Sequence, residues 1–298
     1  MDNQVDGVNV SRVEELNAGH VNDVMRLIDR VGWSVPMERL RLHFRVGQVL
    51  GYFNDNTLAG TVTIFPWQKD IVGVGNLIVH PAYQRRGIGQ RLLEHAMSAG
   101  DVRVQLIATD EGYPLYRKNG FQVTGEIVRL SRNASPGADG HPAIVDKNTR
   151  VYRVTRVSDM DEADLQCLID FDRRVSQVDR ATLYRGLCHS LDTYIITATA
   201  NFDELGGAIV YALEGDRIRI GPVLGQTPAH ARRLFETCIG DFHGPVNLDM
   251  LADSKELLSA AERAGFTASR TSPFMERVGS LPPLSNTGRF ALFDAAMG

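Results

Sequence analysis

The feature that most constrains the fold of this chain is an internal repeat. The segment Arg117–Phe121 corresponds to Glu262–Phe266, and the two phenylalanines stand 145 residues apart. The segment Ala59–Val62 corresponds to Gly206–Ile209 at a spacing of 147 residues. Between the halves, residues 131–147 are rich in Gly, Pro, Ser, Asn and Asp and lack apolar periodicity, as linkers do. Two nearly equal spacings on either side of one linker indicate a duplicated folding unit.

Hydrophobic patterning predicts a matched order of strands and helices in the two halves. In the first half we expect strands at Val8–Val13, Val49–Phe53, Leu58–Phe65, Ile71–Val79, Val102–Ala108 and from Phe121, and helices at His20–Val31, Gly87–Ala99 and Tyr113–Asn119. In the second half we expect strands at Val151–Val157, Tyr194–Thr199, Gly206–Leu213, Ile218–Leu224 and Val246–Met250, and helices at Asp161–Val175, Pro228–Ile239 and Ser254–Ala264. Ser158 or Asp159 is the expected N-terminal cap of the Asp161 helix. The predicted organisation is a domain over residues 1–130, a linker over 131–148 and a second domain over 149–298.

Composition excludes several classes of protein. Of 298 residues, 43% are hydrophobic and 23% are charged, so the chain can bury the cores of two domains and is not a disordered protein. The formal net charge is −4, which gives no global attraction to nucleic acid or to an anionic membrane. The longest apolar runs, such as Ile71–Val79, have about half of the ~20 residues that a membrane-spanning helix needs. The N-terminus lacks the basic start and apolar core of a secretory signal, so we expect a cytoplasmic protein.

Cysteine and histidine spacing gives no metal signal. The three cysteines form no CxxC pair, and the eight histidines show no HxxxH spacing. We therefore expect no metal cofactor.

One segment carries a chemical signal. Residues Asn76–Gln90 predict a strand, a basic turn with two glycines and a helix in direct succession. The N-terminus of a helix leaves backbone N–H groups without partners and has a partial positive charge, so it can bind a phosphate group. Gly87 and Gly89 have no side chains to block that approach, and Arg85 and Arg86 add positive charge. The expected ligand is a polyphosphorylated cofactor.

The spacing of the glycines narrows the choice of cofactor. The segment has neither the GxxxxGK[ST] pattern of a nucleoside triphosphate site nor the GxGxxG pattern of a dinucleotide site. It resembles the acetyl-CoA signature of the GNAT superfamily of N-acetyltransferases, [QR]xxGx[GA], filled here by Gln84, Gly87 and Gly89. About 30 residues later, Leu115–Phe121 resembles the second landmark of that family. The resemblance covers residues 8 to 130.

The resemblance implies an α+β fold in three layers. Its mixed, mostly antiparallel sheet has two central parallel strands, here Ile71–Val79 and Val102–Ala108, which splay apart to admit acetyl-CoA. The backbone of the turn and first helical residues would hold the pyrophosphate, and the strand edge before it would bind the pantetheine arm. The implied cofactor-binding residues are Leu77, Ile78, Val79, Gln84, Arg85, Arg86, Gly87, Ile88, Gly89 and Gln90.

The resemblance also implies catalytic roles. Tyr116 matches the tyrosine that protonates the departing CoA thiolate in many relatives. A phenol, with a reference pKa of about 10, suits that role. The strand Ile71–Val79 contains no acid, so the general base is unassigned, with Glu38, Asp110 and Glu111 as candidates. Three aromatic residues are expected near the acceptor mouth, with core packing as the alternative: Trp33, Phe65 and Trp67.

The second half resembles a degenerate copy of the same fold. At the turn it has Gln226–Ala231, which fits the literal pattern, but Pro228 removes a backbone donor and no arginine precedes the helix. Ala261 stands where the 145-residue spacing places the tyrosine. Gly221–Pro222 and Met275–Gly279 are typical landmarks of a group of bacterial tandem GNAT proteins. We therefore expect a copy without acetyl transfer that shapes the acceptor pocket or the assembly.

Three functions remain open at this point. The first is N-acetyl transfer from acetyl-CoA to the primary amine of a small molecule by direct attack on the thioester. The second is transfer to a protein lysine or N-terminus, and the third is a non-catalytic acetyl-CoA binding or sensing module. Fold resemblance alone does not select the acceptor, and the sequence does not reveal the oligomeric state.

Overall fold

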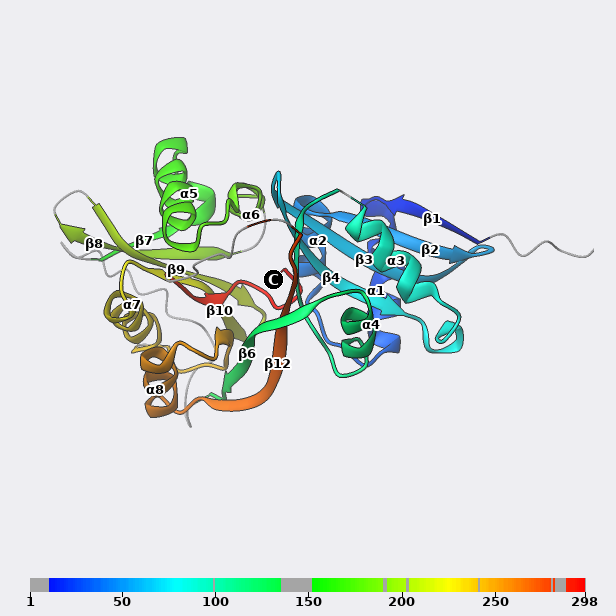
Figure 1. The fold of residues 1–298 in the computed structure, drawn as a ribbon. Coiled ribbons are helices and arrows are strands. Elements are labelled where there is room, and N and C mark those ends of the chain that lie inside the picture. Colours follow the sequence, from blue (N-terminus) through cyan, green and yellow to red (C-terminus); the bar gives the residue numbers. More distant parts are fainter. Residues whose placement is uncertain are drawn as a thin grey trace, which may run out of the picture. The chain divides into compact units, whose positions relative to one another are not determined.

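A computed structural model of the chain describes residues 11–98, 100–134, 152–189, 192–201, 204–240, 242–279, 281 and 288–297 (Figure 1). The chain divides into two compact units. The first consists of Met1–Phe65 and Val74–Gly100, and the second consists of Pro66–Gly73 and Asp101–Gly298. The predicted linker falls mostly on residues 135–148, which lie outside the described residues, and the predicted domain limits stay a prediction.

The secondary structure repeats in the order that the sequence predicts. The first repeat contains β1 Ser11–Leu16, α1 Val21–Arg30, α2 Met37–Val46, β2 Gln48–Asn54, β3 Thr57–Gln68, β4 Ile71–Val79, α3 Ile88–Met97, β5 Arg103–Ile107, α4 Tyr113–Lys118 and β6 Gln122–Arg132. The second repeat contains β7 Tyr152–Arg156, α5 Glu162–Ser176, α6 Ala181–Leu187, β8 Thr193–Asn201, β9 Glu204–Glu214, β10 Arg217–Gly225, α7 Pro228–Gly240, β11 Val246–Leu251, α8 Lys255–Arg263, β12 Thr267–Arg277 and β13 Arg289–Leu292. Short 3-10 turns cover Ala18–His20, Pro81–Tyr83 and Val157–Asp159.

The first unit is a small sheet with an apolar core under α1 and α2. Strands β1, β2 and β3 are antiparallel neighbours, and β4 follows β3 in the sheet. Helix α1 buries Val24, Leu27 and Ile28, whose spacing of three and four residues places them on one face. They cluster with Leu40 of α2 and Ile78 of β4. Full burial of each such aliphatic side chain stabilises the fold by about 1.5–3 kcal/mol.

The second unit contains a strand exchange between the repeats. Strand β12, at the end of the second repeat, lies between β5 and β6 of the first and is antiparallel to both. Strand β6 in turn pairs with β11. The exchange is symmetric, because Gln122 pairs with Glu276 while Ser131 pairs with Thr267, at positions related by the 145-residue spacing. Strand β6 of the first repeat and strand β12 of the second therefore each pair with strands of the other repeat.

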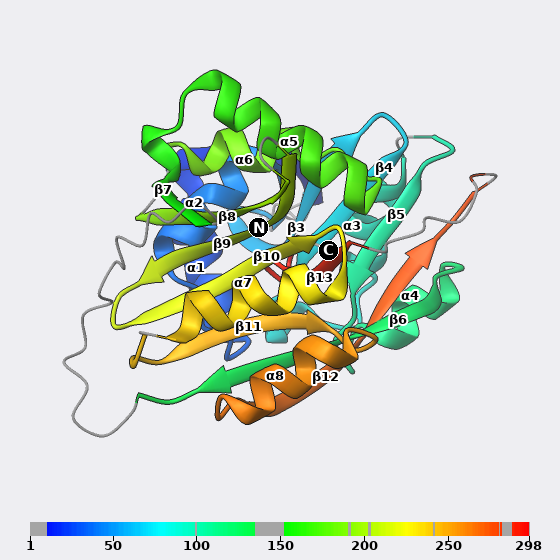
Figure 2. The same ribbon diagram turned by 90° about the vertical axis from the view of Figure 1, so that its left-hand side faces the viewer.

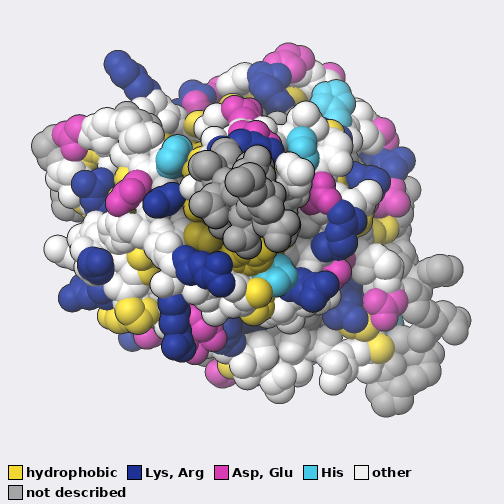
Figure 3. All heavy atoms as spheres, turned by 90° about the vertical axis from the view of Figure 1, so that its right-hand side faces the viewer, with side chains coloured by type: hydrophobic (Ala, Val, Ile, Leu, Met, Phe, Trp, Pro, Cys, Tyr) yellow, Lys and Arg dark blue, Asp and Glu magenta, His cyan; other side chains and the backbone are white. Residues whose placement is uncertain are grey.

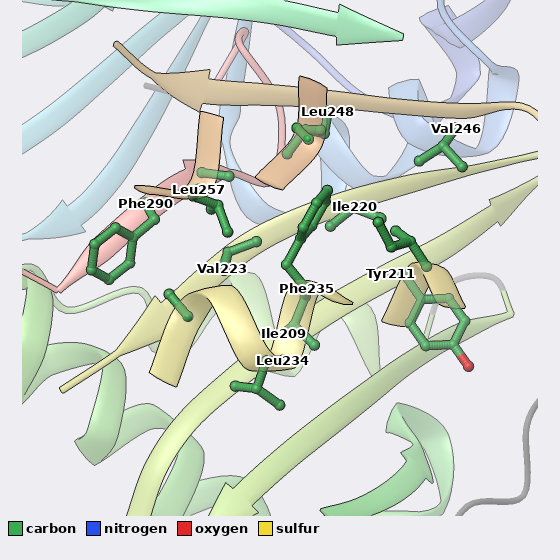
Figure 4. Packing of buried hydrophobic residues seen from close by; sticks show 14 of the residues in the cluster. Ile209, Tyr211, Ile220, Val223, Leu234, Phe235, Val246, Leu248, Leu257 and Phe290 are labelled. Carbon is green, nitrogen blue, oxygen red and sulfur yellow. The ribbon is translucent and has the colours of Figure 1, made fainter. Parts of the chain in front are cut away.

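The core of the second repeat lies between β9–β11 and the helices α7 and α8 (Figure 4). Leu234 and Phe235 of α7 are fully buried, and Phe290 of β13 joins the same cluster. Helices α5 and α6 lie on one side of β8, β9 and β10, and α7 and α8 lie on the other (Figure 2). This is the three-layer α+β arrangement that the sequence predicts.

Local geometry confirms the duplication. Gly120 and Gly265 both have a φ of 83°, which ends α4 and α8 in the left-handed region. The phenylalanine that follows each glycine is buried. At the second matched site, a β-carbon on Gly60 would lie 3.0 Å from the Ile78 carbonyl oxygen, and one on Gly207 would lie 3.0 Å from that of Leu224. Both glycines let strand and helix approach closely.

The structure differs from the sequence prediction in several places. The N-terminal cap of α5 is Asp161, whose carboxylate accepts a hydrogen bond from the Asp164 N–H at 2.7 Å, so the prediction of Ser158 or Asp159 was wrong. Strand β6 extends to Arg132 and so includes the first residues of the predicted linker. Helices α2 and α6 and strands β12 and β13 were not predicted. The parallel pairing of β4 with β5 is confirmed from Ile71–Gly73 to Arg103–Gln105.

Candidate functional site

The turn before α3 has the backbone form that an anion site needs. Gly87 precedes the first helical residue with a φ of 78° and places no side chain over the helix N-terminus. The amides of the first helical turn have no acceptor within a helix, so they remain available to a ligand. Arg85 also has a positive φ, 62°, which is uncommon for a residue with a side chain. The turn is therefore shaped by its backbone, with two residues in the left-handed region.

Side chains of the turn stabilise it through hydrogen bonds to backbone carbonyl oxygens. The Gln84 amide donates to the Val79 carbonyl oxygen at 3.2 Å, and Arg86 donates to the Ala82 carbonyl oxygen at 3.1 Å. The Arg86 guanidinium also lies over the Tyr83 ring, 5.2 Å from its centroid. His80 accepts a hydrogen bond from the Ala82 N–H at 3.2 Å and so caps the short turn Pro81–Tyr83.

Positive charge at the turn is local. Arg85, Arg86 and Arg91 are exposed. On the face shown in Figure 3, Lys and Arg side chains are interspersed with Asp and Glu, and no field of one sign dominates. The arginines around the α3 N-terminus, together with the helix dipole, therefore supply the local attraction for an anion.

A buried polar group fixes the strand that leads into the turn. Asn76 of β4 is 5% exposed and has a φ of 49°, so it breaks the regular strand conformation. Its side-chain amide donates to His43 Nδ1 at 2.8 Å and to Thr63 Oγ1 at 3.2 Å. His43 is fully buried and packs edge-on against Phe65. These contacts hold Asn76 in a strained conformation directly before the Leu77–Val79 edge.

Sequence reasoning did not assign this group. The only signal was one amide side chain in the otherwise apolar run Ile71–Val79. A buried amide must find partners, but the sequence does not say that those partners come from α2 and β3.

Tyr116 is the buried phenol of α4 in the second unit. It is 7% exposed, and burial raises its pKa above the ordinary value. Its ring packs against Phe121, and a β-carbon on Gly112 would lie 2.8 Å from the ring. Among the described residues, its hydroxyl has no hydrogen-bond partner. The phenol stays protonated at neutral pH and can donate to an incoming group.

Sequence families match both repeats. Residues 45–123 match one acetyltransferase (GNAT) domain model, and residues 168–291 match another. The chain belongs to the GNAT acetyltransferases. Its two GNAT domains stand in tandem, as the internal repeat predicts.

Several known proteins match nearly the whole length of the chain. The chain is 23% identical to the uncharacterized N-acetyltransferase YitH of Bacillus subtilis, over 97% of this chain and 99% of that protein. The fold is similar to that of a candidate acetyltransferase from Pyrococcus horikoshii, with a TM-score of 0.75, 18% identity, and coverage of 97% of this chain and 96% of that one. It is also similar to a tandem GNAT protein from the clavulanic acid biosynthesis pathway, with a TM-score of 0.61, 16% identity, and coverage of 92% and 100%.

The predicted acceptor-site aromatics have three different environments. Trp33 of the first GNAT copy is 37% exposed and so is open to a ligand. Phe65 is fully buried beside His43, which makes it a core residue here. Trp67 is 4% exposed, and its indole donates to the Met297 carbonyl oxygen at 3.2 Å. The expectation of core packing, the alternative reading, fits Phe65 and Trp67, and contact with an acceptor stays a prediction.

The candidate bases of this GNAT chain lie on its surface. Glu38 pairs with Arg41 one turn along α2. Asp110 is strongly exposed and lies 3.5 Å from Arg270. Glu111 is exposed, and hydrogen bonds from its own backbone and from Thr109 lower the pKa of its carboxyl group, which weakens it as a base. Their assignment as general base stays a prediction.

The second GNAT copy differs at the equivalent helix. The Thr227 hydroxyl accepts a hydrogen bond from the His230 N–H at 3.2 Å and so caps α7. Arg232 pairs with Glu236 at 3.1 Å on the same helix. The cap uses one backbone donor of α7, and the Glu236 carboxylate neutralises the charge of Arg232. The start of α7 is therefore less suited to an anion than the start of α3.

Within the described ranges, no group of three or more His, Cys, Asp or Glu side chains is placed to bind a metal ion. None of the described helices is long and apolar enough to cross a membrane.

Proposed function

We propose that this GNAT acetyltransferase transfers the acetyl group of acetyl-CoA to a primary amine of a small molecule, as a cytoplasmic enzyme. The observation that carries the proposal is the uncapped N-terminus of α3, which directly follows the Asn76-anchored strand β4. The helix N-terminus suits a diphosphate, and the end of β4 offers a fixed strand edge to an extended chain. Acetyl-CoA has both parts in one molecule.

The cofactor would lie along the end of β4 and the turn. The N–H groups at the start of α3, with Gly87 and Gly89 leaving room, would bind the pyrophosphate. Arg85 and Arg86 would add charge-assisted hydrogen bonds to phosphate. The backbone of Leu77, Ile78 and Val79 would pair with the amides of the pantetheine arm, as a neighbouring strand would. Gln84, Ile88 and Gln90 complete the proposed set of contact residues.

The reaction is direct acyl transfer. The amine lone pair attacks the thioester carbonyl carbon, the carbon–nitrogen bond forms, and the carbon–sulfur bond breaks as the tetrahedral centre collapses. The amine loses one proton in this sequence, and the sulfur leaves as a thiolate. Glu38 is the proposed base candidate for the amine proton, with Asp110 and Glu111 as alternatives.

Tyr116 is the proposed acid. Its pKa is raised by burial, so its phenol stays protonated and donates a hydrogen bond as negative charge develops on sulfur. Because a phenol is a weaker acid than a thiol, we expect stabilisation of the thiolate by hydrogen bonding to be the larger part of its effect. The hydroxyl, which has no hydrogen-bond partner in the described part of the chain, supports this role.

A small acceptor fits the second unit better than a protein segment. Strand β12 covers the edge of β5, and the chain segment up to Met297 covers Trp67. Both contacts reduce the open surface beside β5 that an extended protein tail would need. The proposed acceptor class is therefore a small primary amine, and the exposed Trp33 is its proposed contact.

The test is titration of the full chain with acetyl-CoA, followed by thiol release against a panel of amines. We expect one acetyl-CoA per chain and CoA release that depends on a small amine. Release with a lysine peptide but with none of the small amines would overturn the acceptor class. Binding without release to any amine would contradict transferase activity.

A further inference from the structure

We infer that β13 is a built-in ligand of the second copy, occupying the groove that corresponds to the acetyl-CoA groove of the first copy. The inference rests on the proposed function, because it uses the proposed position of the pantetheine arm in the first copy. It concerns a different site and has its own test.

The central strands of the two copies begin with equivalent parallel ladders. In the first copy the parallel ladder runs from Ile71–Gly73 to Arg103–Gln105. In the second copy the parallel ladder runs from Ile218–Ile220 to Val246–Leu248. Residues Ile71–Gly73 and Ile218–Ile220 are related by the same 147-residue spacing that the sequence repeat has. Each pair of strands therefore begins with an equivalent parallel ladder.

Beyond that ladder, β13 lies between the two strands of the second copy. On one side, Ala291 pairs with Val223 and Arg289 pairs with Leu224 of β10. On the other side, Ala291 pairs with Met250 and Leu292 pairs with Asp249 of β11. A single short strand thus bridges both walls of the opening.

The edge that β13 covers is the equivalent of the proposed pantetheine edge. At this end of the strands the spacing is 146 residues, because Gly60 lies beside the Ile78 carbonyl oxygen as Gly207 lies beside that of Leu224. Leu224 therefore corresponds to Ile78 and Gly225 to Val79. Where the first copy would present backbone to an extended cofactor arm, the second copy presents the same backbone to Arg289. The chemical class of ligand that this groove takes is an extended peptide strand.

Glycines on both sides shape the groove for this strand. A β-carbon on Gly221 would lie 1.8 Å from the Leu292 carbonyl oxygen, so any side chain there would collide with β13. Gly288, at the start of the segment, has a similar constraint, because its β-carbon would lie 2.5 Å from the Val175 β-carbon. The contact with Leu292 explains why a glycine stands at position 221, one of the landmark residues in the sequence.

The segment is also tied at its two ends. The Gly288 N–H donates to the Val175 carbonyl oxygen at 3.1 Å, and its carbonyl oxygen accepts from the Gly225 N–H at 3.0 Å. Beyond β13, the Met297 carbonyl oxygen accepts the hydrogen bond from Trp67. The strand is buried over its whole length, from Arg289 to Leu292.

Two consequences follow from the inference. The second copy binds no acetyl-CoA, so the full chain has one cofactor site. Its groove instead anchors a segment that packs on Trp67 of β3. The second copy therefore binds strand β13 of the same chain.

The first experiment measures how well the groove protects β13 in the full chain. We compare tryptic cleavage after Arg289, which is 6% exposed, with cleavage after Arg103, which is 2% exposed and reports global unfolding. Gly221→Ala should raise cleavage after Arg289 at least about tenfold more than cleavage after Arg103. Gly240→Ala is the matched control, because its β-carbon would meet no atom within 4 Å, and it should behave as the unaltered chain. Equal rises at both arginines in Gly221→Ala would overturn the inference.

The second experiment counts acetyl-CoA sites by calorimetry, so it decides the matter even if Gly221→Ala does not fold. The unaltered chain should bind one acetyl-CoA, and Gly89→Asp in the first copy should bind none. One remaining site in Gly89→Asp, or two in the unaltered chain, would overturn the inference. No binding to the unaltered chain would instead refute the proposed function, so the two failures are distinguishable.

Discussion

The two copies of one fold differ most at the same short stretch of backbone. In the first copy, the end of β4 follows a left-handed asparagine held by His43 and Thr63. In the second copy, the equivalent end of β10 is covered by β13. The strands, helices and terminating glycines around these stretches are otherwise matched. The two copies thus differ in what lies beside one strand edge, which in the second copy is a paired strand.

The helices that follow these strands, α3 and α7, also differ between the two copies at their N-termini. Gly87 leaves the N-terminus of α3 without a side-chain cap, while Thr227 caps α7 with its hydroxyl group. A cap stabilises a helix by about 1 kcal/mol, but it uses a donor that a phosphate would need. The first copy therefore leaves the donors of α3 free of a side-chain cap at some cost in helix stability, and the second copy has the opposite arrangement.

The strongest way to break this comparison is a carboxylate at the start of α3. Gly89→Asp should weaken acetyl-CoA binding about a thousandfold, because a like charge among phosphates costs about 4 kcal/mol. Ala229→Asp makes the matching change in α7 and should leave the affinity unaltered. Calorimetry measures both, and circular dichroism checks that each variant is folded. Unchanged affinity in Gly89→Asp would remove the proposed cofactor site.

The second prediction concerns the buried tyrosines. Tyr116→Phe should lower kcat about a hundredfold with little change in acetyl-CoA affinity, because a positioned proton donor contributes at least about that factor. Tyr211→Phe removes an equally buried phenol from the second copy and should leave kcat unchanged. Because burial raises the pKa of Tyr116, this residue should cause no loss of kcat as the pH rises to about 10. A full rate in Tyr116→Phe would exclude the proposed acid.

The third prediction sharpens the contrast between an anchored and a covered strand edge. Asn76→Ala should lower the free energy of unfolding by about 2 kcal/mol, because it leaves His43 and Thr63 without their buried amide partner. Asn76→Gly should recover about 1 kcal/mol of that loss, since glycine adopts a positive φ freely. Urea unfolding measures both variants. Equal losses would show that the left-handed backbone at this position carries no strain.

The smallest effect is expected at the arginines of the turn. Arg85→Gly keeps the positive φ and removes the charge, so acetyl-CoA should bind about fivefold more weakly, which corresponds to about 1 kcal/mol. The difference should shrink in high salt, because exposed charges are screened. Arg232→Ala, which removes an arginine from α7, is the control and should have no effect. A change of equal size in both variants would contradict a site restricted to the first copy.

Much of this architecture was predictable because its signals are local. The strand, glycine turn and helix at Ile71–Met97 come from contiguous residues, and apolar periodicity predicts each element within a few positions. The duplication was visible because Gly120 and Gly265 both need a left-handed φ, and each precedes a buried phenylalanine. These features depend on neighbours in the sequence.

The unpredicted parts depend on distant contacts. Strand β12 contains Arg270, Thr271, Ser272 and Pro273, which interrupt any apolar alternation, and it is a strand because β5 and β6 lie on either side of it. Strand β13 has only four residues, and its partners are β10 and β11. The partners of Asn76 likewise lie 13 and 33 residues away. No local pattern specifies such neighbours.

The exchange of β6 and β12 has a consequence for synthesis of the chain. During translation, β5 and β6 leave the ribosome well before β12, whose last residue is Arg277. Until then, the edges that pair with β12 lack the strand that lies between them in the folded chain. Exposed strand edges promote association between nascent chains, and pairing across such long sequence separations is slow. The first copy, although it is made first, can complete its fold only when the second copy has been made.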